Sequence, residues 1–298
     1  MSLLAPEPVI YLVEPYGGSI RRQNPNTPHV FWDDAAVTRG DGVFETILIR
    51  NGKPRNVERH LERFARSAEA LQLPVPDAEH WLKATQEAVA DYVRERGGNP
   101  KEVKEAKCTW TLSRGRETTG VATAWLTVRD IDPEVRKQRE NGVKVVTTPR
   151  GFVADPDVPW MVGEAKTLNY AANMAALRWA RGQGADDVIY VERGTGRVLE
   201  GATSTVIMLK KGGRMRTPAP GHGVMAGTTQ AALFALAEKD GFKCKAKDIY
   251  LNELLKAESV WLVSSTRMCA RVTHIDGTTL AAPENEAEIK ALISAAAR

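Results

Sequence analysis

The pattern of apolar and polar positions divides the first part of the chain into short strands and two amphipathic helices. β-Branched and apolar runs predict strands at residues 9–13, 43–50, 106–113 and 121–129. Apolar residues at helical spacing predict helices over 57–71 and 77–96. Asn51-Gly52 is typical of a tight turn, Asn56 is the expected N-cap of the first helix, and residues 15–29 predict a loop.

From residue 143 onward, predicted strands are interspersed with predicted helices. Strands are predicted at 143–148, 188–192, 197–199, 203–209, 243–247, 260–264 and 269–275. Helices are predicted directly after Lys166, over 227–239 and over 284–297. The segment 131–140 is highly charged and contains Pro133, which indicates a linker between domains. We therefore expect an α+β fold with an N-terminal α+β domain at 1–130, a linker at 131–140 and a C-terminal domain at 141–298.

Composition excludes several classes of protein. The chain has 298 residues, 43% of them hydrophobic, which is enough to build a full core. A formal charge of +4 is too weak and too dispersed to indicate nucleic-acid binding. We expect no membrane span and no signal peptide, because no long apolar run or basic leader is visible, and hence a cytoplasmic protein. The three cysteines lack metal-ligand spacing, so no metal site is expected.

Lys166 and Glu200 are the first candidates for chemistry. Lys166 precedes an apolar helix, and a lysine whose ammonium form is disfavoured by burial or nearby positive charge becomes a nucleophile toward carbonyl carbons. Glu200 ends a predicted hairpin strand before Gly201. A carboxylate that faces a pyridine nitrogen keeps it protonated and makes the ring a better electron sink. Each residue alone also fits an exposed surface position, and together they are what a protein needs to hold and tune pyridoxal 5'-phosphate.

Hydroxyl groups and one arginine could bind the phosphate of that cofactor. Thr203 and Ser204 lie just after Glu200, and Thr228 and Thr229 open a predicted helix after Gly227. The free amides and the dipole at a helix N-terminus favour an anion. Arg59, on the first predicted helix, could add a guanidinium that pairs with phosphate.

These motifs occur together and in a fixed order over most of residues 35–275. They read Arg39-Gly40-Asp41-Gly42-Val43-Phe44-Glu45, Arg59-His60-Leu61-Glu62-Arg63, Ser113-Arg114-Gly115, Lys166-Thr167-Leu168-Asn169-Tyr170, Glu200-Gly201-Ala202-Thr203-Ser204-Thr205 and Gly227-Thr228-Thr229. In this the chain resembles the class IV aminotransferases, which are fold-type IV pyridoxal-phosphate enzymes. The family includes branched-chain aminotransferases, D-amino-acid transaminases and 4-amino-4-deoxychorismate lyases. The resemblance implies a two-domain fold with a larger, sheet- or barrel-like C-terminal domain, and a homodimer.

The resemblance also implies a role for each matching residue. Lys166 resembles the lysine that forms a Schiff base with the cofactor, and Glu200 resembles the partner of its pyridine nitrogen. Tyr170 matches a tyrosine near the cofactor's O3′ in some members. Phosphate contacts are implied for Arg59, Thr203, Ser204, Thr228 and Thr229. Position 205 usually holds Asn in the family, and here it is Thr205.

The reaction is less determined than the cofactor. The loop 114–120 lacks the Arg-x-His element of D-amino-acid transaminases and the Tyr-x-Arg element of branched-chain aminotransferases. Its short polar form is similar to actinobacterial aminodeoxychorismate lyases, whereas Glu45 after Phe44 is typical of the transaminases. Phe44, with Arg114 or Arg116 for a substrate carboxylate, is expected on the substrate side.

The sequence leaves two reactions open, together with the alternative that the protein has no catalytic activity. The first is a lyase of the folate pathway that releases 4-aminobenzoate and pyruvate from aminodeoxychorismate. The second is amino transfer between D-amino acids or other amines and a keto acid. A non-catalytic protein that binds pyridoxal phosphate is disfavoured, because Lys166 and Glu200 are both present.

Overall fold

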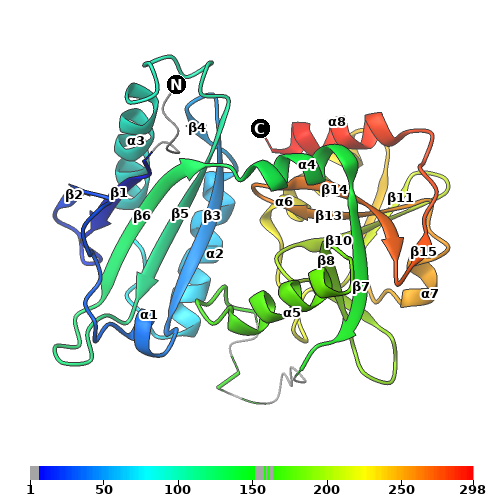
Figure 1. Ribbon diagram of the computed structural model, residues 1–298, viewed down its shortest axis with the longest axis horizontal. Coiled ribbons are helices and arrows are strands. Elements are labelled where there is room, and N and C mark those ends of the chain that lie inside the picture. The colour runs from blue at the N-terminus through cyan, green and yellow to red at the C-terminus, as the bar shows by residue number, and fades with distance from the viewer. Residues whose placement is uncertain (1–6, 152–157, 159, 162–163, 298) are drawn as a thin grey trace. The chain divides into compact units, whose positions relative to one another are not determined.

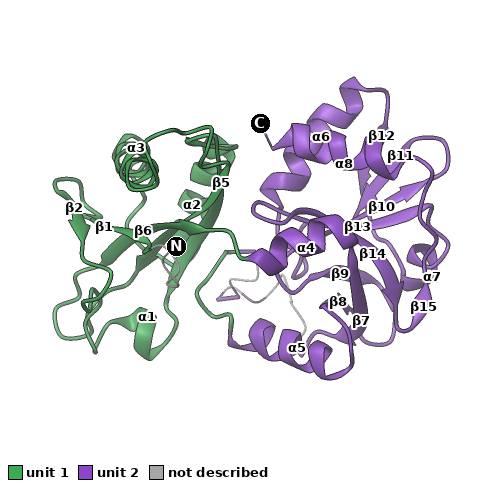
Figure 2. Ribbon diagram, turned by 45° about the horizontal axis from the view of Figure 1, so that its top comes forward, with its two compact units in different colours: residues 1–132, 165–170 green, residues 133–164, 171–298 purple. Residues whose placement is uncertain are grey.

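The computed structural model describes residues 7–151, 158, 160–161 and 164–297. The chain forms two compact units, coloured separately in Figure 2. Unit 1 consists of residues 1–132 together with 165–170, and unit 2 consists of residues 133–164 and 171–298. The segment that carries Lys166 therefore belongs with unit 1, whereas the sequence pattern assigned it to the C-terminal domain.

Unit 1 is built on a six-stranded antiparallel sheet of order β2-β1-β6-β5-β3-β4 (Figure 1). Its strands are β1 (Val9–Val13), β2 (Ile20–Gln23), β3 (Gly42–Arg50), β4 (Lys53–Pro54), β5 (Glu105–Ser113) and β6 (Thr123–Asp130). The four predicted strands are all present. The additional strand β2 lies inside the predicted loop 15–29, because it pairs only along β1 and needs no apolar alternation of its own.

Helices cover one face of this sheet. They are α2 (Val57–Ala70) and α3 (Ala78–Arg94), with the short α1 (Ala35–Thr38) before β3. The core between helices and sheet centres on Phe64, Trp81 and Trp110, whose rings lie 5.0–5.7 Å apart. Asp77 caps α3 as a carboxylate acceptor. Asn56 stands at the predicted N-cap position of α2, but its backbone is left-handed and its side chain makes no cap bond.

Unit 2 is built on a mixed sheet of nine strands. Eight of them follow the order β12-β11-β10-β13-β14-β7-β8-β9, and β15 pairs with β14. The strands are β7 (Val143–Pro149), β8 (Asp187–Val191), β9 (Val198–Gly201), β10 (Thr205–Lys210), β11 (Arg214–Thr217), β12 (Lys243–Ala246), β13 (Ser259–Ser264), β14 (Met268–Ile275) and β15 (Thr278–Thr279). Strand β7 is parallel to both of its neighbours, β8 and β14.

The helices in the described part of unit 2 are α4 (Pro133–Asn141), α5 (Ala171–Gly182), α6 (Thr228–Lys239), α7 (Leu251–Leu254) and α8 (Glu286–Ala296) (Figure 1). The core under α6 and α8 includes Leu233, Trp261 and Ile289. Residues 133–140, predicted as part of the linker 131–140, belong to helix α4. Within the described residues, no helix combines the length and apolar character needed to cross a membrane.

Candidate active site

Lys166 is fixed by backbone hydrogen bonds at the edge of strand β3. The amide of Phe44 donates to the Lys166 carbonyl at 3.0 Å, and the amide of Leu168 donates to the Gly42 carbonyl at 2.8 Å. The Lys166 amide in turn donates to the Ser67 hydroxyl at 3.1 Å. The backbone of Lys166 is therefore held at both its amide and its carbonyl.

The Lys166 amine lies among a hydroxyl and two aromatic rings. Its Nζ is 3.1 Å from the Tyr170 hydroxyl and 4.4 Å from the centroid of the Phe44 ring. The two rings meet edge to face, with centroids 5.1 Å apart. Among the described residues, no carboxylate forms an ion pair with this amine, so no fixed anion competes for it.

A buried ionic cluster lies on the helix-covered face of the same sheet. Glu45 Oε1 accepts from Arg63 Nε at 2.6 Å, and Oε2 accepts from Arg63 Nη2 at 2.8 Å and lies 2.7 Å from His60 Nδ1. Burial alone would raise the pKa of Glu45, but the Arg63 guanidinium and His60 outweigh it and hold the pKa well below its usual range. The cluster is a signal that sequence reasoning missed, although its three residues stand in the quoted motifs.

Arg59 lies on the same helix but outside that cluster. Its side chain is exposed, and the structure gives it no hydrogen bond or ion pair to a described residue. Arg63, four residues later on α2, is 7% exposed and holds Glu45. The phosphate role predicted for Arg59 stays a prediction.

In unit 2, Glu200 at the end of strand β9 is held at both carboxylate oxygens. Arg150 Nη2 donates to Oε1 at 2.5 Å, and the Met225 amide donates to Oε2 at 3.1 Å. The Arg150 guanidinium also donates to the Gly223 carbonyl and lies 5.0 Å from the Tyr190 ring centroid. Glu200 is thereby oriented rather than solvated, and sequence reasoning had not singled out Arg150.

The first turn of α6 and the chain leading into β10 form a small polar cradle in unit 2. A Cβ on Gly227 would lie 2.5 Å from the Thr205 hydroxyl, so the two segments are in close approach. The Ser204 hydroxyl is buried and has no hydrogen-bond partner among the described residues. Thr228 and Thr229 are buried, and Gly227 supplies no side-chain cap to the helix. Unpaired donors at the N-terminus of a twelve-residue helix fit a phosphate group.

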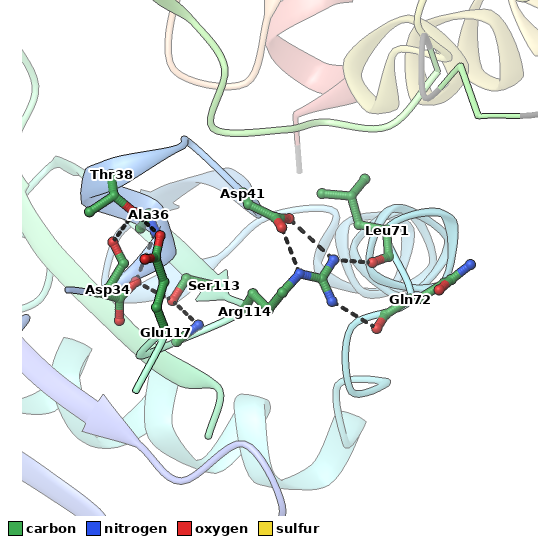
Figure 3. Close-up of polar contacts among 10 residues, drawn as sticks. Asp34, Ala36, Thr38, Asp41, Leu71, Gln72, Ser113, Arg114 and Glu117 are labelled. Atoms are coloured by element: carbon green, nitrogen blue, oxygen red, sulfur yellow. Dashed lines mark hydrogen bonds and ion pairs between the residues drawn. The ribbon is translucent and has the colours of Figure 1, made fainter. Parts of the chain in front are cut away.

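The two arginines expected on the substrate side are engaged with carboxylates. Arg114 Nε donates to Asp41 at 2.6 Å, and its Nη2 donates to the Leu71 carbonyl at 2.6 Å (Figure 3). Arg116 Nε donates to Asp33 at 2.9 Å, and its guanidinium lies 4.1 Å from the centroid of a phenylalanine ring. Neither guanidinium is left without an anionic partner. No group of side chains in the described part of the chain has the makings of a metal site.

Comparison with known proteins identifies the family. Residues 42–275 match the family described as amino-transferase class IV. The chain belongs to the class IV aminotransferases. This class IV aminotransferase is thus a pyridoxal-phosphate-dependent enzyme, and the predicted enzyme class and cofactor are confirmed.

This class IV aminotransferase is similar to individual proteins and solved structures over most of its length. It is 39% identical over 264 residues to a bifunctional aminodeoxychorismate lyase / D-amino acid transaminase of Mycobacterium tuberculosis, covering 86% of this chain and 89% of that protein. A PLP-bound hypothetical aminotransferase from Mycobacterium tuberculosis superposes with a TM-score of 0.89 at 37% identity, over 96% and 98% of the two chains. A fold IV-transaminase from Curtobacterium pusillum gives 0.89 at 39% identity, over 98% and 100%. The predicted α+β, two-domain fold of type IV is confirmed.

Proposed function

We propose that this enzyme converts 4-amino-4-deoxychorismate into 4-aminobenzoate and pyruvate, with Lys166 as the proton-transfer group. The observation that carries the proposal is the Lys166 amine, 3.1 Å from the Tyr170 hydroxyl and unpaired with any described carboxylate. An amine that no fixed anion holds can accept and return a proton at the substrate carbon. The lyase activity named for the relative at 39% identity supports this substrate.

The chain's own residues divide the work of binding and proton transfer. Pyridoxal phosphate, when bound, supplies an electron sink for the carbon that bears the amino group. Lys166 would hold the cofactor and move the proton of that carbon, and its amine is hydrogen-bonded to the Tyr170 hydroxyl. Glu200, oriented by Arg150, would pair with the ring nitrogen. The phosphate would be bound by Ser204, Thr228 and Thr229, together with Thr203 and Arg59.

Arg63 is the competing candidate for the phosphate guanidinium. It lies on the same helix as Arg59 and is already oriented by Glu45. Affinity of the cofactor-free protein for pyridoxal phosphate, measured by fluorescence titration, separates the two. Weaker binding in Arg59→Met alone supports the role predicted for Arg59, whereas weaker binding in Arg63→Met alone assigns it to Arg63.

A second candidate function is amino transfer from D-amino acids to keto acids. The transaminase activity in the name of the same relative favours it, as does Glu45, which follows Phe44 as in the transaminases. Lys166 would serve it with the same proton transfer at the amino-bearing carbon. Both reactions therefore need the same proton transfer by Lys166.

A single assay separates the two candidates. Purified enzyme loaded with pyridoxal phosphate is given aminodeoxychorismate without any keto acid, and 4-aminobenzoate is measured by its fluorescence. Release under these conditions supports the lyase, whereas strict dependence on a keto acid, with exchange from D-alanine or D-glutamate, supports the transaminase.

The variant Lys166→Ala tests the proposed role of Lys166 in holding the cofactor and moving the proton. The variant should lose both reactions and the visible absorption of the bound cofactor. Lys144→Ala, at an exposed lysine on β7, should lose neither. A wild-type protein that stays colourless with pyridoxal phosphate would contradict the proposal altogether.

A further inference from the structure

Lys107 on strand β5 shares a sheet face with Phe44. The register pairs Phe44 with Thr111 and Leu48 with Lys107, so these four residues point to one side. The intervening Cys108 and Trp110 point to the other side, into the core under the helices. Lys107 therefore lies on the face away from α2 and α3, where the Phe44 ring contacts the Lys166 amine.

Lys107 is half-buried and lacks a close partner. The structure gives its amine no hydrogen bond or ion pair to a described residue. Burial lowers the pKa of Lys107, the charges of Arg129 and Lys166 lower it further, and Asp132 acts in the opposite direction. An incoming anion would offset this unfavourable environment of the ammonium group.

The arginines of the 114–120 loop do not provide such a cation. Arg114 is bound by Asp41 and by the Leu71 carbonyl just after α2, and Arg116 is bound by Asp33. Substrate binding through either of them would first require breaking these contacts. Lys107 requires no such exchange.

The spacing along the strand sets which substrate group Lys107 can reach. Phe44 and Leu48 are four residues apart, or about 13 Å along β3. A lysine side chain extends roughly 6 Å from its Cα. The ammonium thus stays several ångströms from the strand position of Phe44, too far for a carboxylate bonded directly to the reacting carbon. Thr46 and Thr109 lie half-buried between them on the same face, and their hydroxyls are suited to a polar substrate chain.

We infer that Lys107 binds the second, distal carboxylate of a dicarboxylic substrate on the sheet face that carries Phe44. The inference rests on the proposed function in that Lys166 marks the reacting end. Aminodeoxychorismate has two carboxylates, and among the substrates of the transaminase candidate so do D-glutamate and 2-oxoglutarate. A charge-assisted contact of this kind also selects dicarboxylates over monocarboxylates.

Binding of two unreactive acids to the cofactor-loaded enzyme tests this inference without turnover. Glutarate has two carboxylates, and pentanoate has the same carbon chain with one. Calorimetry should show glutarate binding about tenfold more tightly than pentanoate to the wild-type protein. Lys107→Met should reduce glutarate affinity to the pentanoate level, and Lys107→Arg should retain most of the difference.

Lys53→Met is the matched control, because Lys53 is an exposed lysine of the same sheet. It should leave both affinities unchanged. If Lys107→Met does not fold, Lys107→Gln replaces it in the same titration. A wild-type protein without a preference for glutarate overturns the inference, and so does a Lys107 variant that keeps the preference.

Turnover measurements keep this result separate from the proposed function. If the enzyme produces 4-aminobenzoate or transfers amino groups, but glutarate binding does not depend on Lys107, the proposed function stands and the inference about Lys107 is wrong. If the enzyme carries out neither reaction but binds glutarate through Lys107, the proposed function is wrong and the inferred dicarboxylate site stands.

Discussion

The buried Glu45 carboxylate makes two contacts with Arg63 and one with His60. It is fully buried and bonded to Arg63 and His60, so its pKa lies below that of an unfolded glutamate, about 4.3. A carboxyl with a lowered folded-state pKa contributes stability above the unfolded pKa and loses it as the pH falls toward the folded value. We therefore expect the free energy of unfolding to fall from about pH 5 downward, by up to about 1.4 kcal/mol per pH unit from this group.

Glu45→Gln tests that prediction through urea unfolding between pH 3 and 7. The variant should lose about 3 kcal/mol at pH 7, because Arg63 is left buried without its anion. Its stability should also depend less on pH than that of the wild type. Glu58→Gln, at an exposed glutamate on α2, the helix that carries Arg63, should keep the wild-type slope. Equal slopes in all three proteins would contradict the assignment.

We expect Arg150 to affect stability and cofactor binding by holding the Glu200 carboxylate. Their side chains are only 11% and 16% exposed, so Arg150→Met leaves a largely buried carboxylate without its cation. We expect the cofactor-free protein to lose about 3 kcal/mol of unfolding free energy, measured with urea, and to bind pyridoxal phosphate more weakly. Arg150→Lys should recover only part of this, since lysine lacks the planar fork. The exposed Arg193→Met should change neither quantity, and a similar loss in both methionine variants would refute the assignment.

At the scale of elements, Arg114 connects a loop to the end of a helix. Its guanidinium contacts Asp41, before β3, and the Leu71 and Gln72 carbonyls at the C-terminus of α2 (Figure 3). These acceptors include carbonyls that no helix amide satisfies. The structure thus gives this arginine a structural task in unit 1.

Arg114→Met should therefore affect stability more than substrate binding. We expect a fall of about 1 kcal/mol, or about 2–4 °C in thermal midpoint, because the ion pair is partly exposed. The KM for the substrate should stay within about twofold of wild type. A tenfold rise in KM with an unchanged midpoint would instead restore Arg114 to the substrate side.

The elements that sequence patterns predicted well are those that bury their own apolar residues. Strand β3 and helix α2 carry that pattern internally, and both were predicted within a residue or so. Strand β2, with the sequence Ile-Arg-Arg-Gln, depends on its pairing with β1. Helix α4 buries none of its residues, so its charged sequence resembled a linker. Local patterns do not report pairing between distant segments.

The same limit applies to the candidate site. Lys166 and Glu200 were predictable because each stands in a motif with its own chemical logic. The engagement of Arg114 with Asp41, 73 residues away in the sequence, is a tertiary contact that its motif does not encode. Arg150 was missed for the same reason, since its partner Glu200 lies 50 residues later.

At the scale of the whole molecule, we expect two chains to associate. Unit 1 exposes Phe31, Trp32 and Val37 within seven residues of sequence, an apolar surface of the kind that favours association. Sedimentation equilibrium should give a mass twice the 32.7 kDa of one chain. Trp32→Ala should weaken the dimer, whereas Trp160→Ala, at a tryptophan with the same 77% exposure, should not. A monomer at micromolar concentration would contradict the expectation.

The return of residues 165–170 to unit 1 has a consequence for synthesis on the ribosome. Backbone bonds between this segment and the start of β3 cannot form until the intervening residues 133–164 have been translated. At about 5–20 residues per second this delay is roughly 2 to 8 s, during which part of the β3 edge stays unpaired in the nascent chain. A gene divided at residue 132 would make that state permanent, and its first product would lack Lys166 as well.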